Sequence, residues 1–208
     1  EKTLLEVGQR RIGQYFHHIN PLLLEAFDQL DKKGGNLPGV ATGFQDLDQL
    51  TSGLQKSDFI IIAARPSMGK TALCLNVAEH IAIHTHLPVG IFSLEMSKEQ
   101  LVHRLISSHA RVNGHHIRTG RLAEEEIHRI SVAVSDLYNA PIYIDDTPGI
   151  STFEIRAKAR RLKSEVKHLG LVVVDYLQLV RGPRTENRVQ EISEIARSLK
   201  TLARELEV

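Results

Sequence analysis

The feature that most constrains the fold is a phosphate-loop pattern at residues 64–71, directly after an apolar run at residues 59–63. A glycine-containing turn before a helix aims several backbone N–H groups at one point, and the helix N-terminus adds its positive end. Gly69, Lys70 and Thr71 supply the glycine, a charge and a hydroxyl. Because such a loop joins a buried strand to a helix, we predict a strand at residues 59–63 and a helix from Lys70 to about His84.

The residues of this loop are expected to share the binding of ATP and Mg²⁺. Lys70 places its charge on the β- and γ-phosphates, and the Thr71 hydroxyl ligates Mg²⁺. Ala64 stands where the motif usually has its first glycine, and alanine fits there if its φ is negative. The residues predicted to bind the nucleotide are Ser67, Met68, Gly69, Lys70, Thr71 and Ala72.

Two carboxylates end apolar runs in the way that a nucleotide hydrolase requires. Asp175 ends the run at residues 171–175, where an acid holds Mg²⁺ through a water. Glu95 ends the apolar run that follows the phosphate-loop helix. The carboxyl ends of parallel strands share one edge, so Glu95, Asp175 and Lys70 should converge and act as the catalytic residues. Glu95 would polarise the attacking water, and the alternative is an acid that caps the helix after Ser97.

The remaining pattern predicts an α/β fold. Further apolar runs at residues 89–94, 141–144 and 170–175 alternate with helical segments. Strands without polar alternation are covered on both sides, which indicates a mainly parallel sheet with helices on both faces.

Capping signals mark where two of these helices begin. Ser97 with Gln100, and Ser151 with Glu154, have the spacing of capping boxes. The last segment is predicted as a helix with one buried face, because its apolar residues recur every three or four positions. These residues are Val189, Ile192, Ile195, Leu199, Leu202 and Leu206.

We predict two parts, a helical arm at residues 1–31 and an ATPase domain at residues 32–208. The loop at residues 32–39 contains three glycines and a proline, which favour a boundary. The arm packs either on its own domain or on a neighbouring subunit, and the residues themselves leave both open.

The sequence indicates the roles of the other charged residues less directly. Residues 176–180 should continue the strand end into a polar loop, whose arginines Arg181, Arg184 and Arg188 either track a DNA backbone or are simply solvated. Arg104 is interpreted as a surface arginine, and the basic helix before Lys167 as a solvated face. Asp145 and Asp146 precede a turn and receive no catalytic role, and Cys74 is assigned to the core.

Composition narrows the setting without identifying the partner. The net charge of +1 does not indicate nucleic-acid binding, so any DNA contact must come from a local patch. The single cysteine cannot form an internal disulfide, and no apolar run reaches the length of a membrane span. We therefore expect a cytoplasmic protein with no membrane partner.

The combined motifs resemble the bacterial DnaB-type replicative DNA helicase over nearly the whole chain. They include residues 63–71, 92–97, 117–120, 142–146 and 174–179, together with residues 42–44, 47–48 and 51–54. The resemblance implies a RecA-like P-loop core, preceded by an N-terminal linker helix near residues 1–20 that packs on the adjacent subunit. It implies a homohexameric ring around single-stranded DNA, with primase and a helicase loader as partners. It also implies Glu95 as the catalytic carboxylate, Asp175 as the residue that serves Mg²⁺, and Arg104 as a nucleotide contact.

The chain also departs from the family pattern. The primase-docking domain, the γ-phosphate sensor strand and the arginine finger are not in it, so we expect the chain alone to bind nucleotide but to unwind poorly. The alternative functions are a RecA/RadA-type recombinase, a small-molecule kinase, and a nucleotide-gated assembly or scaffold module. DNA-stimulated ATP turnover separates a motor from a scaffold.

Overall fold

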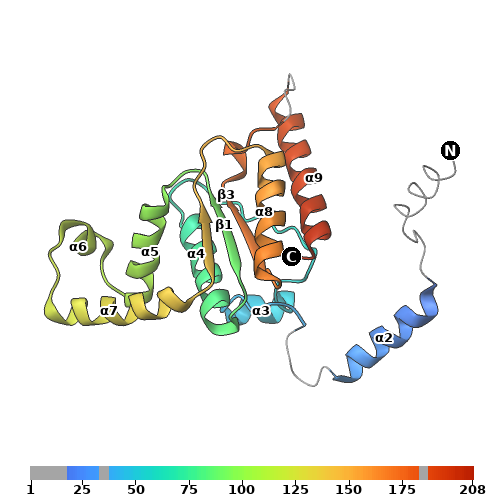
Figure 1. Ribbon diagram of the computed structural model, residues 1–208, viewed down its shortest axis with the longest axis horizontal. Coiled ribbons are helices and arrows are strands. Elements are labelled where there is room, and N and C mark those ends of the chain that lie inside the picture. The colour runs from blue at the N-terminus through green and yellow to red at the C-terminus, as the bar shows by residue number, and fades with distance from the viewer. Residues whose placement is uncertain (1–17, 33–37, 183–186) are drawn as a thin grey trace. The chain divides into compact units, whose positions relative to one another are not determined.

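The computed structural model describes residues 18–32, 38–182 and 187–208 of the chain (Figure 1). It comprises two units, Glu1–Leu37 and Pro38–Val208. In the first unit, helix α2 covers Ile19–Lys32 with Pro21 in its first turn, where a missing N–H is tolerated. The boundary that we place after residue 31 stays a prediction, and the linker helix expected near residues 1–20 lies almost entirely outside the described residues.

The second unit is built on a parallel sheet, as predicted. Its strands are β1 (Val89–Ser93), β2 (Ile142–Asp145) and β3 (Leu171–Asp175), in the order β2-β1-β3. Val89 pairs with Ile142 on one side and with Leu171 on the other, and both pairings are parallel. All three strands therefore end at the same edge of the sheet.

The helices alternate with the strands along the chain. Both predicted capping boxes are present, because the hydroxyls of Ser97 and Ser151 accept N–H groups of Gln100 and Glu154, whose side chains accept in return. The α-helices of this unit are α3 (Gln45–Thr51), α4 (Lys70–His80), α5 (Lys98–Ala110), α6 (Gly114–Thr119), α7 (Glu124–Asn139), α8 (Thr152–Val166) and α9 (Arg188–Leu206). The π-helix η1 (Ile81–Thr85) extends α4, and η2 (Leu177–Leu179) is a 3₁₀ turn after β3.

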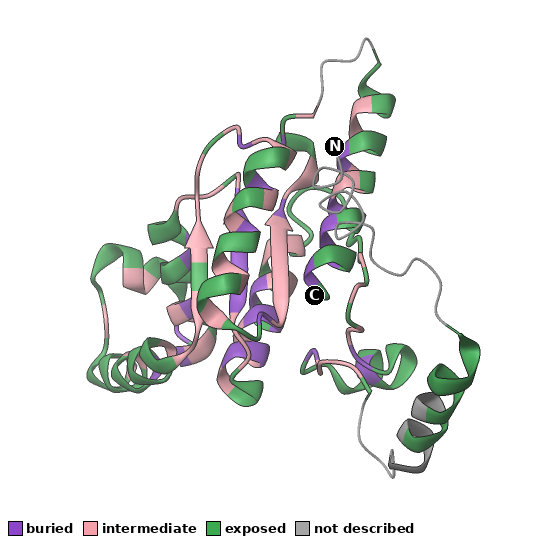
Figure 2. Cartoon of the chain, turned by 45° about the vertical axis from the view of Figure 1, so that its right-hand side comes forward, coloured by how far each residue is buried: buried purple, intermediate pink, exposed green. Residues whose placement is uncertain are grey.

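Two apolar layers cover the two faces of the sheet. On one face, Val89 and Ile91 of β1 pack in a cluster with buried residues of α4 and α5. On the other face, Phe92 packs with buried residues of α8 and α9. Figure 2 shows the buried positions of these elements in purple. Helices on both faces confirm the predicted fold class.

Two predicted strand segments are wrong. Residues 59–63 pair with no described strand, and Ile60, Ile61 and Ile62 are 53%, 64% and 41% exposed. An apolar run favours burial, but a strand also requires a hydrogen-bonded neighbour, and no described segment supplies one. Residues 176–180 do not continue β3 either, because the chain turns into η2 immediately after Tyr176.

The basic face of α8 is engaged in ion pairs and is not simply solvated, contrary to the interpretation from the sequence. Arg156 and Arg160 both pair with Glu205 of α9. Lys158 pairs with Asp145 at the end of β2, with 2.5 Å between Nζ and Oδ2. These ion pairs hold α8 against α9 and the end of β2. The partners are distant in the sequence, so the sequence pattern of α8 could not indicate the pairs.

Candidate nucleotide site

The phosphate loop ends at a left-handed glycine that begins helix α4. Gly69 has a φ of 87° and is the N-cap residue, and Ser67 is also left-handed with a φ of 63°. A Cβ built on Gly69 would meet nothing within 4 Å, so the requirement for glycine comes from the backbone angle alone. Ala64 is not among the residues with positive φ, which agrees with the condition that we set for alanine there.

Thr71 and Asp175 meet directly, although they are 104 residues apart in the chain. The Thr71 hydroxyl donates to Oδ2 of Asp175 at 2.7 Å. Asp175 is only 6% exposed, so this bond supplies a partner that a buried carboxylate requires. The structure thereby joins the start of the phosphate-loop helix to the end of β3.

Lys70 lies beside the same strand end. Its Nζ stands 4.7 Å from the centroid of the Tyr176 ring, within the range of a cation–π contact. Tyr176 was not predicted from the sequence as a site residue, although its position directly after Asp175 was an available signal.

Cys74 also lies near these charges. Burial is the main cause that raises the pKa of its thiol, and the charge of Asp175 raises the pKa further while Lys70 opposes it. A raised pKa keeps the thiol protonated and unreactive. Cys74 itself is only half-buried and belongs to none of the buried clusters, so its assignment to the core is not confirmed.

Sheet pairing brings Glu95 to the same edge. Ser93 of β1 pairs with Asp175 of β3, and the Leu94 N–H donates to the Asp175 carbonyl at 2.7 Å. Glu95 follows one residue later and is exposed. The N-cap of α5 is Ser97 with Gln100, so Glu95 does not serve as the cap. The convergence of Lys70, Asp175 and the Glu95 backbone is therefore a property of the fold.

The other predicted nucleotide contacts are exposed residues on either side of the start of α4 and on α5. Ser67, Met68 and Ala72 are exposed at the start of α4. Arg104 is exposed on α5, and its side chain forms no hydrogen bond or ion pair with any described residue. Their contacts with a nucleotide stay predictions.

The arginines of the candidate DNA loop differ in their surroundings. Arg188 pairs with Glu191 at 2.5 Å and also donates to the Gln178 carbonyl. The Arg181 guanidinium lies against Gly149, and Arg184 is outside the described residues. Arg188 is therefore already engaged within the chain and is less available to a phosphate backbone than its sequence suggests.

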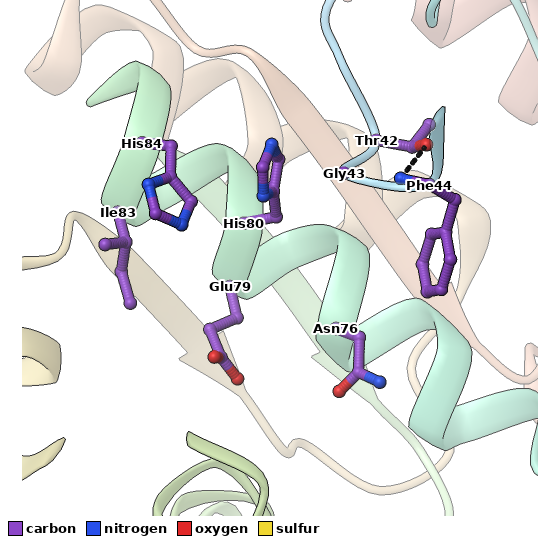
Figure 3. Close-up of a pocket in the computed structure, with 8 residues that line it drawn as sticks. All are labelled: Thr42, Gly43, Phe44, Asn76, Glu79, His80, Ile83 and His84. Atoms are coloured by element: carbon purple, nitrogen blue, oxygen red, sulfur yellow. Dashed lines mark hydrogen bonds between the residues drawn. The ribbon is translucent and has the colours of Figure 1, made fainter. Parts of the chain in front are cut away.

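A separate cleft of about 180 Å³ lies farther along α4 (Figure 3). Thr42, Phe44, Glu79, His80 and His84 are among the residues that line it. Asn76, the lining residue of α4 nearest to Lys70 in the sequence, is six residues beyond it, which is about 9 Å along a helix. The cleft is therefore distinct from the nucleotide site.

The donor set at the nucleotide site suits magnesium. A hydroxyl and a carboxylate at one helix start are hard oxygen ligands, and Mg²⁺ keeps several waters beside such groups. Within the described residues, no three His, Cys, Asp or Glu side chains gather into a complete metal site.

In the same part of the chain, no helix is long and apolar enough to cross a membrane.

Comparison with known proteins identifies the family. The family model of the DnaB-like helicase C-terminal domain matches residues 39–208. The chain belongs to this family. The RecA-like ATPase fold predicted from the motifs is confirmed.

Relatives of the DnaB-like family are similar over the whole chain. The replicative DNA helicase DnaC of Bacillus subtilis is 49% identical over 213 aligned residues, and these include all of this chain and 47% of the relative. The replicative DNA helicase DnaB of Geobacillus stearothermophilus gives the same identity and coverage. The chain therefore spans about half the length of the curated relatives that it matches.

Two solved structures resemble the fold. One is an ATPase domain that superposes with a TM-score of 0.88 at 36% identity, covering 93% of this chain and 69% of that one. The other is a DnaB-like replicative helicase, solved in a study of its interactions with primase. It gives a TM-score of 0.83 at 34% identity and covers 99% of this chain and 50% of that chain.

Proposed function

We propose that this chain is the ATP-hydrolysing motor domain of a replicative DNA helicase. The observation that carries the proposal is the meeting of Thr71 and Asp175 at 2.7 Å, beside the strand end that carries Glu95. Family membership and the names of the relatives agree with this arrangement.

Each residue has a distinct role in this proposal. Lys70 and the amides of the loop hold the β- and γ-phosphates, and Arg104 contacts the nucleotide from α5. Thr71 would hold Mg²⁺ directly and Asp175 would hold it through water, and an ion held there would supply charge neutralisation at the phosphates. Glu95 accepts a proton from the attacking water and orients it. Ser67, Met68, Gly69 and Ala72 complete the nucleotide contacts.

The proposed working form is a homohexamer on single-stranded DNA. Relatives named as replicative DNA helicases support unwinding as the task, and the primase named with one similar structure supports primase as a partner. A helicase loader follows from the same family expectation. The loop with Arg181, Arg184 and Arg188 is the proposed DNA contact, made to the backbone because it lacks an aromatic residue for stacking. Since a bacterial chromosome lies in the cytoplasm, we place the protein there.

ATP hydrolysis with and without single-stranded DNA tests this function. We expect slow turnover by the 208-residue chain, and turnover stimulated severalfold by DNA when the chain is extended with the remainder of the Bacillus subtilis relative. Glu95→Gln should lower turnover by about a hundredfold in both forms, to a small residual rate, while nucleotide binding persists. Tight binding without turnover in either form would instead favour a nucleotide-gated scaffold.

A further inference from the structure

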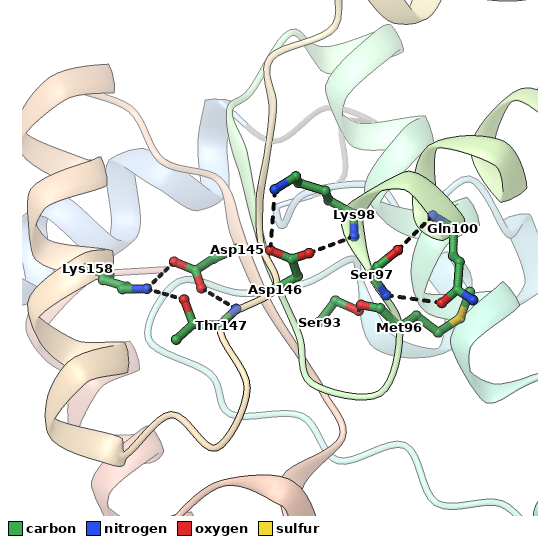
Figure 4. A network of polar contacts seen from close by, with 9 residues as sticks. All are labelled: Ser93, Met96, Ser97, Lys98, Gln100, Asp145, Asp146, Thr147 and Lys158. Carbon is green, nitrogen blue, oxygen red and sulfur yellow. Dashed lines mark hydrogen bonds and ion pairs between the residues drawn. The ribbon is translucent and has the colours of Figure 1, made fainter.

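The turn that carries Glu95 is held at its first end by a buried serine (Figure 4). Ser93 is 2% exposed, and its hydroxyl donates to the Met96 carbonyl at 2.7 Å. The next residue, Leu94, is bonded to the backbone of Asp175. The chain therefore enters the turn from a fixed position.

The second end of this turn is held by Asp146, which follows a different strand. Lys98 is the first residue of α5, and its N–H donates to Oδ2 of Asp146 at 3.0 Å. The Lys98 ammonium lies 4.0 Å from the other carboxylate oxygen. The first N–H groups of a helix have no partner inside the helix, so this acceptor satisfies one that Ser97 and Gln100 do not reach.

The neighbouring Asp145 contacts α8 and not α5. It accepts from the Lys158 ammonium at 2.5 Å and from the Thr147 N–H at 3.0 Å, and so it fastens α8 and the following turn. Burial raises the pKa of its carboxyl, but the bonds from Lys158 and Thr147 outweigh burial and leave the pKa below the usual value. The two adjacent acids thus hold two different helices.

Glu95 has no hydrogen-bonding partner of its own among the described residues, so the backbone on either side decides where its carboxylate lies. We propose that Asp146 is a positioning residue for Glu95, which it places by holding the start of α5. This rests on the proposed function, in which Glu95 orients the attacking water. Small displacements of a catalytic group lower the rate steeply, because a well-oriented group acts at a very high effective concentration.

Three substitutions of Asp146 distinguish the effect of its hydrogen bond to Lys98 from the effect of its negative charge. Asp146→Asn keeps an oxygen acceptor for the Lys98 N–H, Asp146→Glu keeps the charge but displaces it, and Asp146→Ala removes both. Asp145→Ala is the matched control, since it breaks the bonds to α8 and leaves α5 bound. Basal ATP hydrolysis by the 208-residue chain and amide hydrogen exchange at Lys98 are the two readouts.

We expect Asp146→Ala and Asp146→Glu to lower kcat about tenfold with KM for ATP unchanged within about twofold, because the phosphate loop still binds the nucleotide. Asp146→Asn should keep kcat within about threefold of the unchanged chain. Exchange at the Lys98 amide should accelerate in the alanine variant and stay slow in the asparagine variant. Asp145→Ala should leave this exchange unchanged.

A double variant distinguishes the proposal from a purely structural role. In a Glu95→Gln background, Asp146→Ala should not lower the residual rate further. A further tenfold loss there, or full kcat in Asp146→Glu, would overturn the positioning role. If Glu95→Gln alone leaves turnover unchanged, the proposed function itself fails, whatever the exchange at Lys98 shows, and the positioning role fails with it.

Discussion

At the scale of single residues, the bond between Thr71 and Asp175 links the phosphate loop to the sheet. It joins a helix start to a strand end, and the acid is nearly inaccessible to water. A hydrogen bond to a charged group contributes about 1.5–3 kcal/mol when its loss would leave that group buried without a partner. The same two side chains are the proposed magnesium ligands, so this residue pair contributes to both stability and function.

Thr71→Ala should therefore weaken the protein in two ways. We expect the free energy of unfolding to fall by about 1.5–3 kcal/mol without Mg²⁺, because the Asp175 carboxylate loses a donor. Mg²⁺-dependent ATP affinity should also fall at least tenfold. Urea denaturation and titration calorimetry measure the two effects.

Thr71→Ser is the matched control for this substitution. It keeps the hydroxyl and should stay close to the unchanged chain in both measurements. Equal stability of the alanine and serine variants would show that the bond to Asp175 contributes nothing to the fold.

At the scale of elements, His109 of α5 connects three helices. Its Nδ1 lies 2.7 Å from Oε1 of Glu79 on α4, and its Nε2 lies 3.1 Å from Oδ2 of Asp136 on α7. Both partners are carboxylates, so both ring nitrogens donate only when the imidazole is charged. Burial lowers the pKa of His109, but the two carboxylates outweigh burial and the pKa is raised.

This connection predicts a pH-dependent stability. Because the pKa is raised in the folded state, the contribution of His109 is complete below the unfolded pKa, about 6.5, and is lost as pH rises through the folded pKa. His109→Gln should therefore lower Tm by several degrees near pH 6 and by less near pH 9. Thermal unfolding of both proteins across this range measures the difference.

His103→Gln is a suitable control, since His103 is exposed on the same helix. It should leave Tm unchanged at every pH. A deficit of the His109 variant that grows as pH rises would contradict the charged connection.

At the scale of the whole molecule, the apolar clusters belong to one unit. Every buried residue of the three clusters falls within Pro38–Val208, while α2 in the other unit exposes Leu22, Leu23, Leu24 and Phe27. The described candidate residues of the nucleotide site also lie within Pro38–Val208. Folding and nucleotide binding therefore should not depend on the first unit.

Removal of residues 1–37 tests this independence. We expect the shortened chain to keep its Tm within about 3 °C, since a free-energy change below 1 kcal/mol shifts Tm by only a few degrees at this size. Its affinity for Mg-ATP should be unchanged. A large fall in Tm would show that the arm contributes to the core, which is the first of the two arrangements considered for it.

Much of the local structure could be predicted from the sequence because its causes are local. The start of α4 follows from Gly69 and Lys70, and the two capping boxes follow from residues three positions apart. The three paired strands were apparent as apolar runs, since burial on both faces leaves no polar alternation. The candidate residues Lys70, Thr71, Glu95 and Asp175 were also found in this way, because each stands at the end of such a run or loop.

Tertiary structure alone decided which elements meet. Pairing of β1 with β3 sets Ser93 opposite Asp175, and no local pattern contains the order of strands. The apolar run at residues 59–63 resembled a strand, yet its backbone finds no described partner. Asp146 was indistinguishable from an ordinary turn residue until the fold brought it to Lys98, 48 positions away. Local chemistry fixes helix starts and apolar faces, whereas hydrogen bonds between distant segments depend on how the whole chain packs.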